Sequence, residues 1–271
     1  MLTLCLAGAM TVVPATVWSS WSFAPAIFVP LVLLAVAYAC GLMLERRRDG
    51  VRREGAWREA GLFAVGFVLL VVALVSPLCR LAASLASAHM VQHLILVALA
   101  PPLLAAGAAP MLSRLLPRRF RSDMSALLRK PAVAAGLYGA AIWFWHIPHF
   151  YTAALTSIPA HLVMYGSLLA AALLFWSVVL GAARSAEQAG MAVLILLGTL
   201  VHTGMLGALL SMSRTVWYPV MSTGSVAWGL TPLEDQQLAG LIMWVPMGLA
   251  YLVAALAVVA AALANLRART S

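Results

Sequence analysis

Long apolar stretches separated by short polar connections dominate the chain. Seven of them approach or exceed the ~20 mostly apolar residues that an α-helix needs to cross ~30 Å of hydrocarbon. They run from Phe23 to Met43, Ala60 to Leu78, Ser87 to Ala108, Ala132 to Phe150, Ile158 to Gly181, Gln188 to Ser211 and Gln237 to Ala261. The pattern predicts an all-α polytopic membrane protein with about seven transmembrane helices, forming a single integral membrane domain over residues 1–271.

The basic residues lie in the connections and set the expected orientation. Six arginines fall between Glu45 and Glu59, and five arginines with the only lysine fall between Met111 and Pro131. Short loops rich in Lys and Arg stay on the cytoplasmic side. This topology puts every basic residue except Arg80 and Arg214 on one side. We therefore expect the N-terminus outside and the C-terminus in the cytoplasm.

The composition agrees with this topology. The chain is 64% hydrophobic and 9% charged, which excludes an ordinary soluble domain. The net charge of +9 reflects cytoplasmic loops rather than a nucleic-acid-binding stripe. Cys5, Cys40 and Cys79 form no closely spaced pair, so we expect small buried apolar residues. No Lys or Arg precedes Arg46, so a cleavable signal is not expected and the N-terminus should be retained.

All six histidines fall in the predicted outer half of the bilayer. Counting ~1.5 Å per residue places three of them about 6 to 14 Å below the outer surface and three within about 5 Å of it. The deeper tier is His93, His146 and His202, and the shallower tier is His89, His149 and His161. His89 and His93 share one helix face, and Pro148 should bend the fourth span beside His146.

Such a cluster points to a metal site. Ionisable groups inside a membrane are usually functional, and neutral imidazole is the commonest ligand of Zn, Cu, Fe and Ni. Thioethers near imidazoles favour copper as Cu(I), although methionines in apolar helices also serve as packing residues. The possible soft ligands are Met90, Met164, Met205 and Met243. Two histidines from different helices could instead hold a haem iron.

Two acidic residues open the last span. Thr231 to Glu234 reads as a capping box with Pro232 at the first helical position, so Glu234 is expected to cap its own helix. Asp235 could orient a ligand imidazole or stabilise the same helix start.

Three segments resemble a known family. The first comprises Gln92 to Leu94, Ala100 to Leu104 and Gly107 to Pro110. The second is Trp145-His146-Ile147-Pro148 with the residues up to Leu155, and the third is Pro232 to Pro246, which contains Asp235-Gln236 and Met243-Trp244. Together they span about residues 86–246 and resemble the polytopic CtaG family of cytochrome c oxidase assembly factors, associated with caa-type oxidases.

The resemblance implies a non-enzymatic protein of the bacterial plasma membrane that helps to mature the oxidase, plausibly by supplying copper. The expected partners are the oxidase subunits, a copper donor protein and the lipid bilayer. His93, His146 and His161 match family histidines, and Asp235 matches the acidic position. In the family pattern, another histidine often stands four residues after the position of His161, whereas this chain has Tyr165 there.

Other functions stay open at this point. A bis-histidine haem protein, for example with His93 and His202 as ligands, would show a Soret band. A metal-free scaffold for oxidase assembly would use the histidines in interhelical hydrogen bonds. A membrane hydroxylase or desaturase matches only through the His89 and His93 spacing, and no HExxH motif suggests a metalloprotease. A retinal protein would need a lysine in the last span, where there is none.

Overall fold

A computed structural model of the chain describes residues 5, 12–49, 55–115, 119, 130–182 and 186–270. The described residues form helices and no strands. The long elements are α1 (Pro25–Asp49), α2 (Ala56–Leu74), α4 (Ala86–Leu94) continuing through the π-helix η2 (Ile95–Leu99) into α5 (Ala100–Leu115), α7 (Pro131–His146), α9 (Ile158–Ala182), α10 (Ala186–Met212) and α12 (Pro232–Thr270). The short ones are η1 (Pro14–Ser19), α3 (Pro77–Leu81), α8 (Pro148–Thr156), η3 (Pro219–Met221), α11 (Ser222–Ser225) and η4 (Val226–Trp228).

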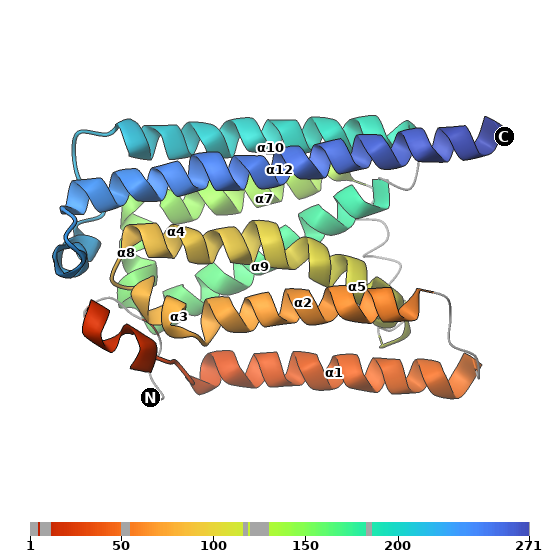
Figure 1. Cartoon of the computed structure of the whole chain (residues 1–271), viewed down its shortest axis with the longest axis horizontal. Coiled ribbons are helices and arrows are strands. Elements are labelled where there is room, and N and C mark those ends of the chain that lie inside the picture. Colours follow the sequence, from red (N-terminus) through yellow and green to blue (C-terminus); the bar gives the residue numbers. More distant parts are fainter. Residues whose placement is uncertain are drawn as a thin grey trace.

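The long helices form an elongated bundle, with η1 near one end of it and the C-terminal end of α12 at the other (Figure 1). Six helical segments in the described part of the chain are long and apolar enough to cross a membrane: α1, α2, the α4–α5 segment, α9, α10 and α12. The 16-residue α7 packs against α9 and α10 as a shorter companion. The predicted all-α polytopic membrane fold is confirmed.

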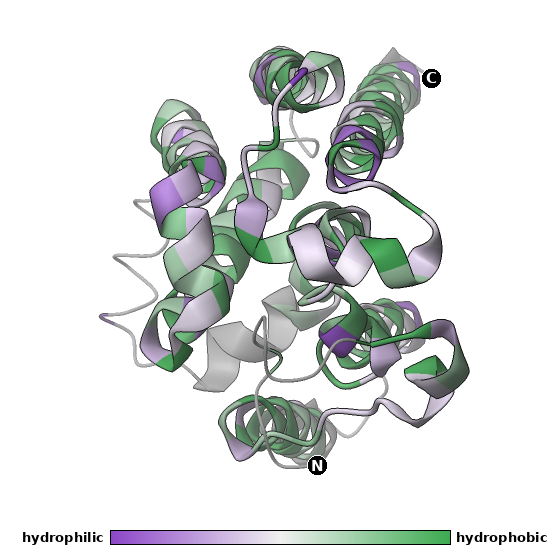
Figure 2. Ribbon diagram, turned by 90° about the vertical axis from the view of Figure 1, so that its left-hand side faces the viewer, coloured by the Kyte–Doolittle hydropathy of each residue, from purple (hydrophilic) through white to green (hydrophobic). Residues whose placement is uncertain are grey.

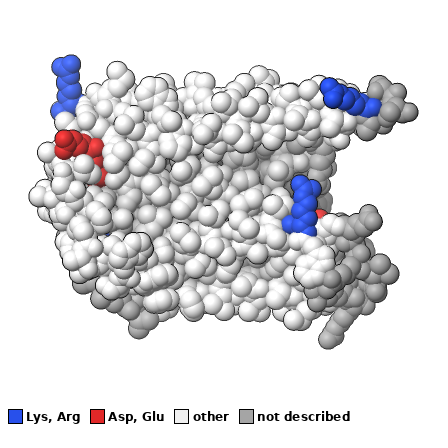
Figure 3. Space-filling model, in the orientation of Figure 1, with Lys and Arg blue, Asp and Glu red and all other residues white. Residues whose placement is uncertain are grey.

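The surface agrees with a membrane setting. The bundle seen from one end is mostly hydrophobic around its helices (Figure 2). On the face shown in Figure 3, the charged side chains of the described residues lie at the two ends. The C-terminal ends of α1, α5 and α12 and the N-terminal ends of α2 and α7 lie at the same end of the bundle (Figure 1). The orientation, with the N-terminus outside, was predicted from the Lys and Arg residues of the loops. Most of those side chains are not among the described ones, so the orientation stays a prediction.

The predicted fourth span is wrong at its outer end. The sequence suggested one segment from Ala132 to Phe150, but α7 ends at His146 and α8 begins at Pro148. Ile147 between them is extended, with ψ of 126°. A residue before proline disfavours the helical conformation, and proline fits the first position of a new helix. The predicted bend at Pro148 is therefore a full break, which ends α7 beside the segment that joins α10 to α12.

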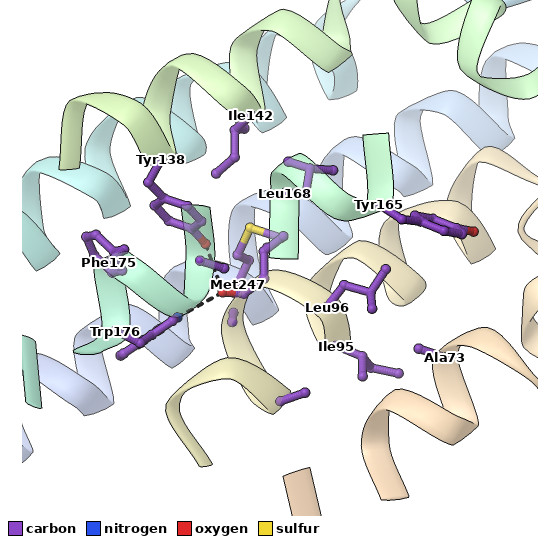
Figure 4. Packing of buried hydrophobic residues seen from close by; sticks show 14 of the residues in the cluster. Ala73, Ile95, Leu96, Tyr138, Ile142, Tyr165, Leu168, Phe175, Trp176 and Met247 are labelled. Carbon is purple, nitrogen blue, oxygen red and sulfur yellow. Dashed lines mark hydrogen bonds between the residues drawn. The ribbon is translucent and has the colours of Figure 1, made fainter. Parts of the chain in front are cut away.

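Two prolines follow a π-helical turn in the third span. Pro101 and Pro102 have no N–H, so the carbonyl of Val97 lacks the donor that the next turn would supply. The Tyr138 hydroxyl donates to this carbonyl at 2.9 Å and Trp176 Nε1 donates at 2.8 Å (Figure 4). Tyr138 Oη also lies 2.6 Å from Tyr251 Oη. This polar network fastens α7, α9 and α12 to the third span.

Glycines allow α10 and α12 to pack very closely. A Cβ atom on Gly207 would lie 2.8 Å from both Gly240 O and Trp244 N, and one on Gly204 would lie 3.3 Å from the Trp244 ring. Inside a membrane the hydrophobic effect does not drive helices together, so close van der Waals contact, which small residues allow, holds such crossings. The contact fixes the rotation of α12, whose inner face reaches the site described below.

The expectation for the cysteines is wrong in two respects. Cys5 and Cys79 are buried, as expected, but form a disulfide, and Cys40 is exposed on α1 instead of buried. The two bonded residues are 74 positions apart, so a search for closely spaced pairs could not reveal them. Disulfides persist in oxidising compartments, which accords with an outward-facing location for this end of the bundle.

Candidate metal centre

Four of the six histidines meet in the interior near the α8 end of the bundle. His89 and His93 are one turn apart on α4, with ring centroids 4.3 Å apart. His146 is the last residue of α7, and its ring centroid lies 5.9 Å from that of His93. His161, in the first turn of α9, packs 4.3 Å from the ring of Tyr165, whose hydroxyl donates to Gln92 of α4 at 2.9 Å, so it lies beside this group. All four side chains are buried.

The hydrogen bonds of three of these rings leave one nitrogen of each ring available. A backbone carbonyl can only accept, so a ring nitrogen bonded to one must carry the hydrogen, and the other nitrogen keeps its lone pair. The pairs are His89 Nδ1 with Ala82 O at 3.2 Å, His146 Nδ1 with Ile142 O at 2.7 Å and His161 Nδ1 with Ala154 O at 2.9 Å. The Nε2 atoms of these three rings and of His93 are buried and have no hydrogen-bond partner among the described residues.

This pattern is the one that metal-binding histidines show, because a ligating imidazole usually donates its other N–H to a carbonyl or carboxylate. The rings are not drawn tightly around one point, however. Within the described ranges, no group of three or more His, Cys, Asp or Glu side chains meets the spacing of a formed metal site. The arrangement is a cluster of oriented donors, and metal binding stays a prediction.

The other two histidines lie elsewhere. His202 is half-buried on α10, where its Nδ1 accepts a hydrogen bond from Trp143 Nε1 at 3.3 Å. Its ring lies 3.3 Å from the position that a Cβ atom on Gly139 would occupy. His149 is exposed on α8 and stacks edge-to-face on Phe150. The two tiers inferred from depth therefore do not describe the grouping, since each tier contributes two histidines to the cluster and one outside it.

A small cavity of about 10 Å³ adjoins the cluster, the space of roughly one water molecule. His93 and His146 line it together with Met90, Met243 and Met247, and the remaining lining residues are Val97, Ile142 and Leu168. Figure 4 shows Met247 among Ile142, Leu168 and Tyr138. Of the predicted soft ligands, Met90 and Met243 are here. Met164 is buried but does not line the cavity, and Met205 is 52% exposed on the outer face of α10.

The two acidic residues have separate tasks. Glu234 forms the predicted capping box: its carboxylate accepts from Thr231 N at 2.8 Å, and Glu234 N donates to Thr231 Oγ1 at 3.2 Å. Asp235 caps a different helix, because its buried carboxylate accepts from Ala86 N at 2.6 Å and Ser87 N at 3.0 Å. It thus secures the start of α4, three residues before His89.

The segment after α10 folds over this end of the bundle, held by residues that sequence reasoning did not select. Tyr218 donates to the carbonyl of His146 at 2.8 Å and stacks on Tyr151 at 3.9 Å. Tyr151 also lies 5.1 Å from the His89 ring, and its buried hydroxyl has no partner among the described residues. Gln236 binds the backbone of Thr215 and Trp217. Nothing in the sequence separates these aromatic residues from ordinary packing residues.

Tyr165 occupies the position where the family pattern often has a histidine. Its hydroxyl donates to Gln92 Oε1 at 2.9 Å, and Gln92 Nε2 donates to Ala73 O at 2.6 Å. The Tyr165 ring packs 4.3 Å from the His161 ring. A tyrosine here joins α9, α4 and α2 beside the cluster and is already engaged as a hydrogen-bond donor.

The fold and the cluster together define a multi-pass helical membrane protein that carries oriented imidazoles near one end of its bundle. The family model for the cytochrome c oxidase caa3 assembly factor (Caa3_CtaG) matches residues 36–265. The chain belongs to this family, and its role lies in the assembly of that oxidase. No curated protein and no solved structure matches the chain.

Proposed function

We propose that the protein binds copper at His89, His93, His146 and His161 and passes it to the oxidase during assembly in the bacterial plasma membrane. The observation that supports this most directly is the set of four buried Nε2 atoms without partners in the described part of the chain. A buried polar atom left without a partner costs about 1 to 3 kcal/mol, and folded proteins tolerate few. Four together are more economically explained as donors to an ion.

The spacing of the rings suits an ion of this kind. Two imidazoles that bind one ion at about 2 Å place their ring centres about 5 to 6 Å apart at open coordination angles. The His93 and His146 centroids are 5.9 Å apart, whereas His89 and His93 are closer at 4.3 Å. The His89 or His161 ring would need a modest movement to bring a third imidazole nitrogen to an ion held between His93 and His146. A site that binds without being fully closed is compatible with a cargo that must be released.

The same cavity argues against haem as the alternative ligand. About 10 Å³ accommodates an ion or a water molecule and is far smaller than a macrocycle. His202, the suggested second axial ligand, lies outside the cluster beside Trp143. A metal-free scaffold remains the competing function, because it would need only the interhelical contacts.

Metal loading of purified full-length protein tests the proposal. The protein in detergent would be loaded with buffered Cu(I), desalted and analysed for metal and for a Soret band. We expect about one copper ion per wild-type chain and close to none in a His93→Ala, His146→Ala double variant. His149→Ala and His202→Ala are matched controls and should bind as the wild type does. Equal copper contents in the double variant and the wild type would refute the site.

A test in cells distinguishes delivery from scaffolding. A deletion strain should lack oxidase activity and regain it in part with excess copper in the medium. If the double histidine variant assembles active oxidase as well as the wild type does, the protein acts as a scaffold and the proposed delivery is wrong.

A further inference from the structure

The cavity beside the histidines has a composition that its imidazoles do not explain. Three methionines line it, Met90 from α4 and the pair Met243 and Met247 from α12. All three are at most 2% exposed. Met243 and Met247 are four residues apart, so their side chains lie on the same face of α12. Two helices thus bring thioethers to the cavity wall, where His93 and His146 each have an Nε2 atom with no partner in the described ranges.

From this lining we infer that the cavity is a thioether-imidazole subsite selective for a soft monovalent cation, Cu(I), over Cu(II) and Zn(II). The inference rests on the proposed copper function and adds to it the charge and ligand class of the cargo. It assigns Met90, Met243 and Met247 as ligands, whereas Met164 and Met205 take no part.

Ligand softness is the first reason for this selectivity. Thioether sulfur is a soft donor that favours Cu(I), while divalent zinc is bound in proteins by imidazole, thiolate and carboxylate. The eight residues that line the cavity include no carboxylate. The nearby Asp235 carboxylate is already engaged by Ala86 N and Ser87 N.

The charge of the ion is the second reason. The cost of moving an ion from water into a medium of low dielectric constant rises with the square of its charge, so a divalent ion costs about four times as much as a monovalent one. The cavity walls are neutral and mostly apolar and provide no anion to offset a second charge. This lining therefore favours a soft monovalent ion over a divalent one.

Methionine-to-leucine variants provide a sharp test because this exchange nearly conserves volume and is well tolerated in buried positions. The triple variant Met90→Leu, Met243→Leu, Met247→Leu would be compared with Met164→Leu, which is buried outside the cavity lining, and Met205→Leu, which is exposed. Purified full-length proteins would be titrated with Cu(I) against a competing chelator, with Ag(I) as a second soft monovalent probe, and with Zn(II). X-ray absorption would report sulfur ligands.

We expect the triple variant to lose Cu(I) and Ag(I) affinity by at least tenfold, together with the Cu–S signal, while Zn(II) binding changes by less than about twofold because it depends on the histidines. The two control variants should match the wild type. Unchanged Cu(I) affinity in the triple variant, or an equal loss for Cu(I) and Zn(II), would overturn the subsite while the histidine proposal stands. Failure of the wild type to bind any Cu(I) would instead refute the proposed function itself, and with it this subsite.

Discussion

Replacing Asp235 should loosen the helix that carries His89 and His93. The first N–H groups of a helix lack partners within the helix, and Leu85, at the N-cap of α4, provides no side-chain acceptor. The Asp235 carboxylate accepts from Ala86 N, Ser87 N and Ser87 Oγ, and the residue is only 1% exposed. Asparagine at this position keeps one oxygen but turns an amide N–H₂ group toward the same donors.

The loss of stability expected in these variants follows from the number of buried N–H donors that lose their acceptor. A buried donor that loses its acceptor costs about 1 to 3 kcal/mol, so Asp235→Asn should destabilise the protein by about 2 kcal/mol. Asp235→Ala removes the acceptor from both backbone N–H groups and should cost about 2 to 6 kcal/mol. Copper affinity should fall in both variants because the start of α4 no longer holds His89 in place.

Thermal unfolding of purified protein, followed by circular dichroism, would measure the loss. Glu234→Gln is the matched control, since its carboxylate caps only α12 and is solvent-exposed, and its effect should be much smaller. Ser87→Ala removes a single hydroxyl donor and should cost about 1 kcal/mol. If Asp235→Asn proves as stable as Glu234→Gln, Asp235 does not support α4 in the way argued above.

Two further predictions concern the frame of the bundle. Gly207→Ala places a Cβ atom 2.8 Å from backbone atoms of α12 and should cost about 1 to 3 kcal/mol, whereas at Gly198 an added Cβ meets no described atom within 4 Å and alanine should be tolerated. Comparable melting temperatures for the two variants would contradict the close α10–α12 crossing. Breaking the disulfide by Cys79→Ser should cost about 2 to 4 kcal/mol, and a thiol reagent should label Cys40 alone in denatured, unreduced wild-type protein. Labelling of all three cysteines before reduction would show that the disulfide is absent.

Six of the seven predicted spans have counterparts among the described residues, because apolar length decides whether a helix can cross a bilayer. The fourth was predicted too long, because the break before Pro148 ends α7 at His146. Depth along each helix could also be counted, but the direction in which a side chain points around its helix could not. His202 shows the consequence, since it lies at a suitable depth yet faces Trp143 and Gly139. His161 shows the converse, because it was placed near the surface and is buried beside Tyr165.

Contacts between distant parts of the chain account for the other features that the sequence did not predict. Asp235 was expected either to orient a ligand imidazole or to stabilise the start of its own helix, whereas the helix that it caps begins 149 positions earlier in the chain. The Cys5–Cys79 bond, the Tyr218 bond to the His146 carbonyl and the contact of Tyr165 with Gln92 join distant segments in the same way. No local pattern specifies such pairs, because each depends on which helices become neighbours.

One stripe along α12 connects these separate observations. Asp235, Met243, Met247 and Tyr251 are spaced by multiples of four residues and are all buried, so they lie along one slowly turning face of the helix. Along this face the helix first caps α4, then lines the cavity below His93 and His146, and then reaches Tyr138 through the Tyr251 hydroxyl. The glycine contact with α10 sets the rotation of α12, and a small rotation would disturb the cap, the thioethers and the tyrosine pair together. The family segment from Pro232 to Pro246 therefore aligns α4 with the cavity, in addition to contributing the proposed ligand Met243.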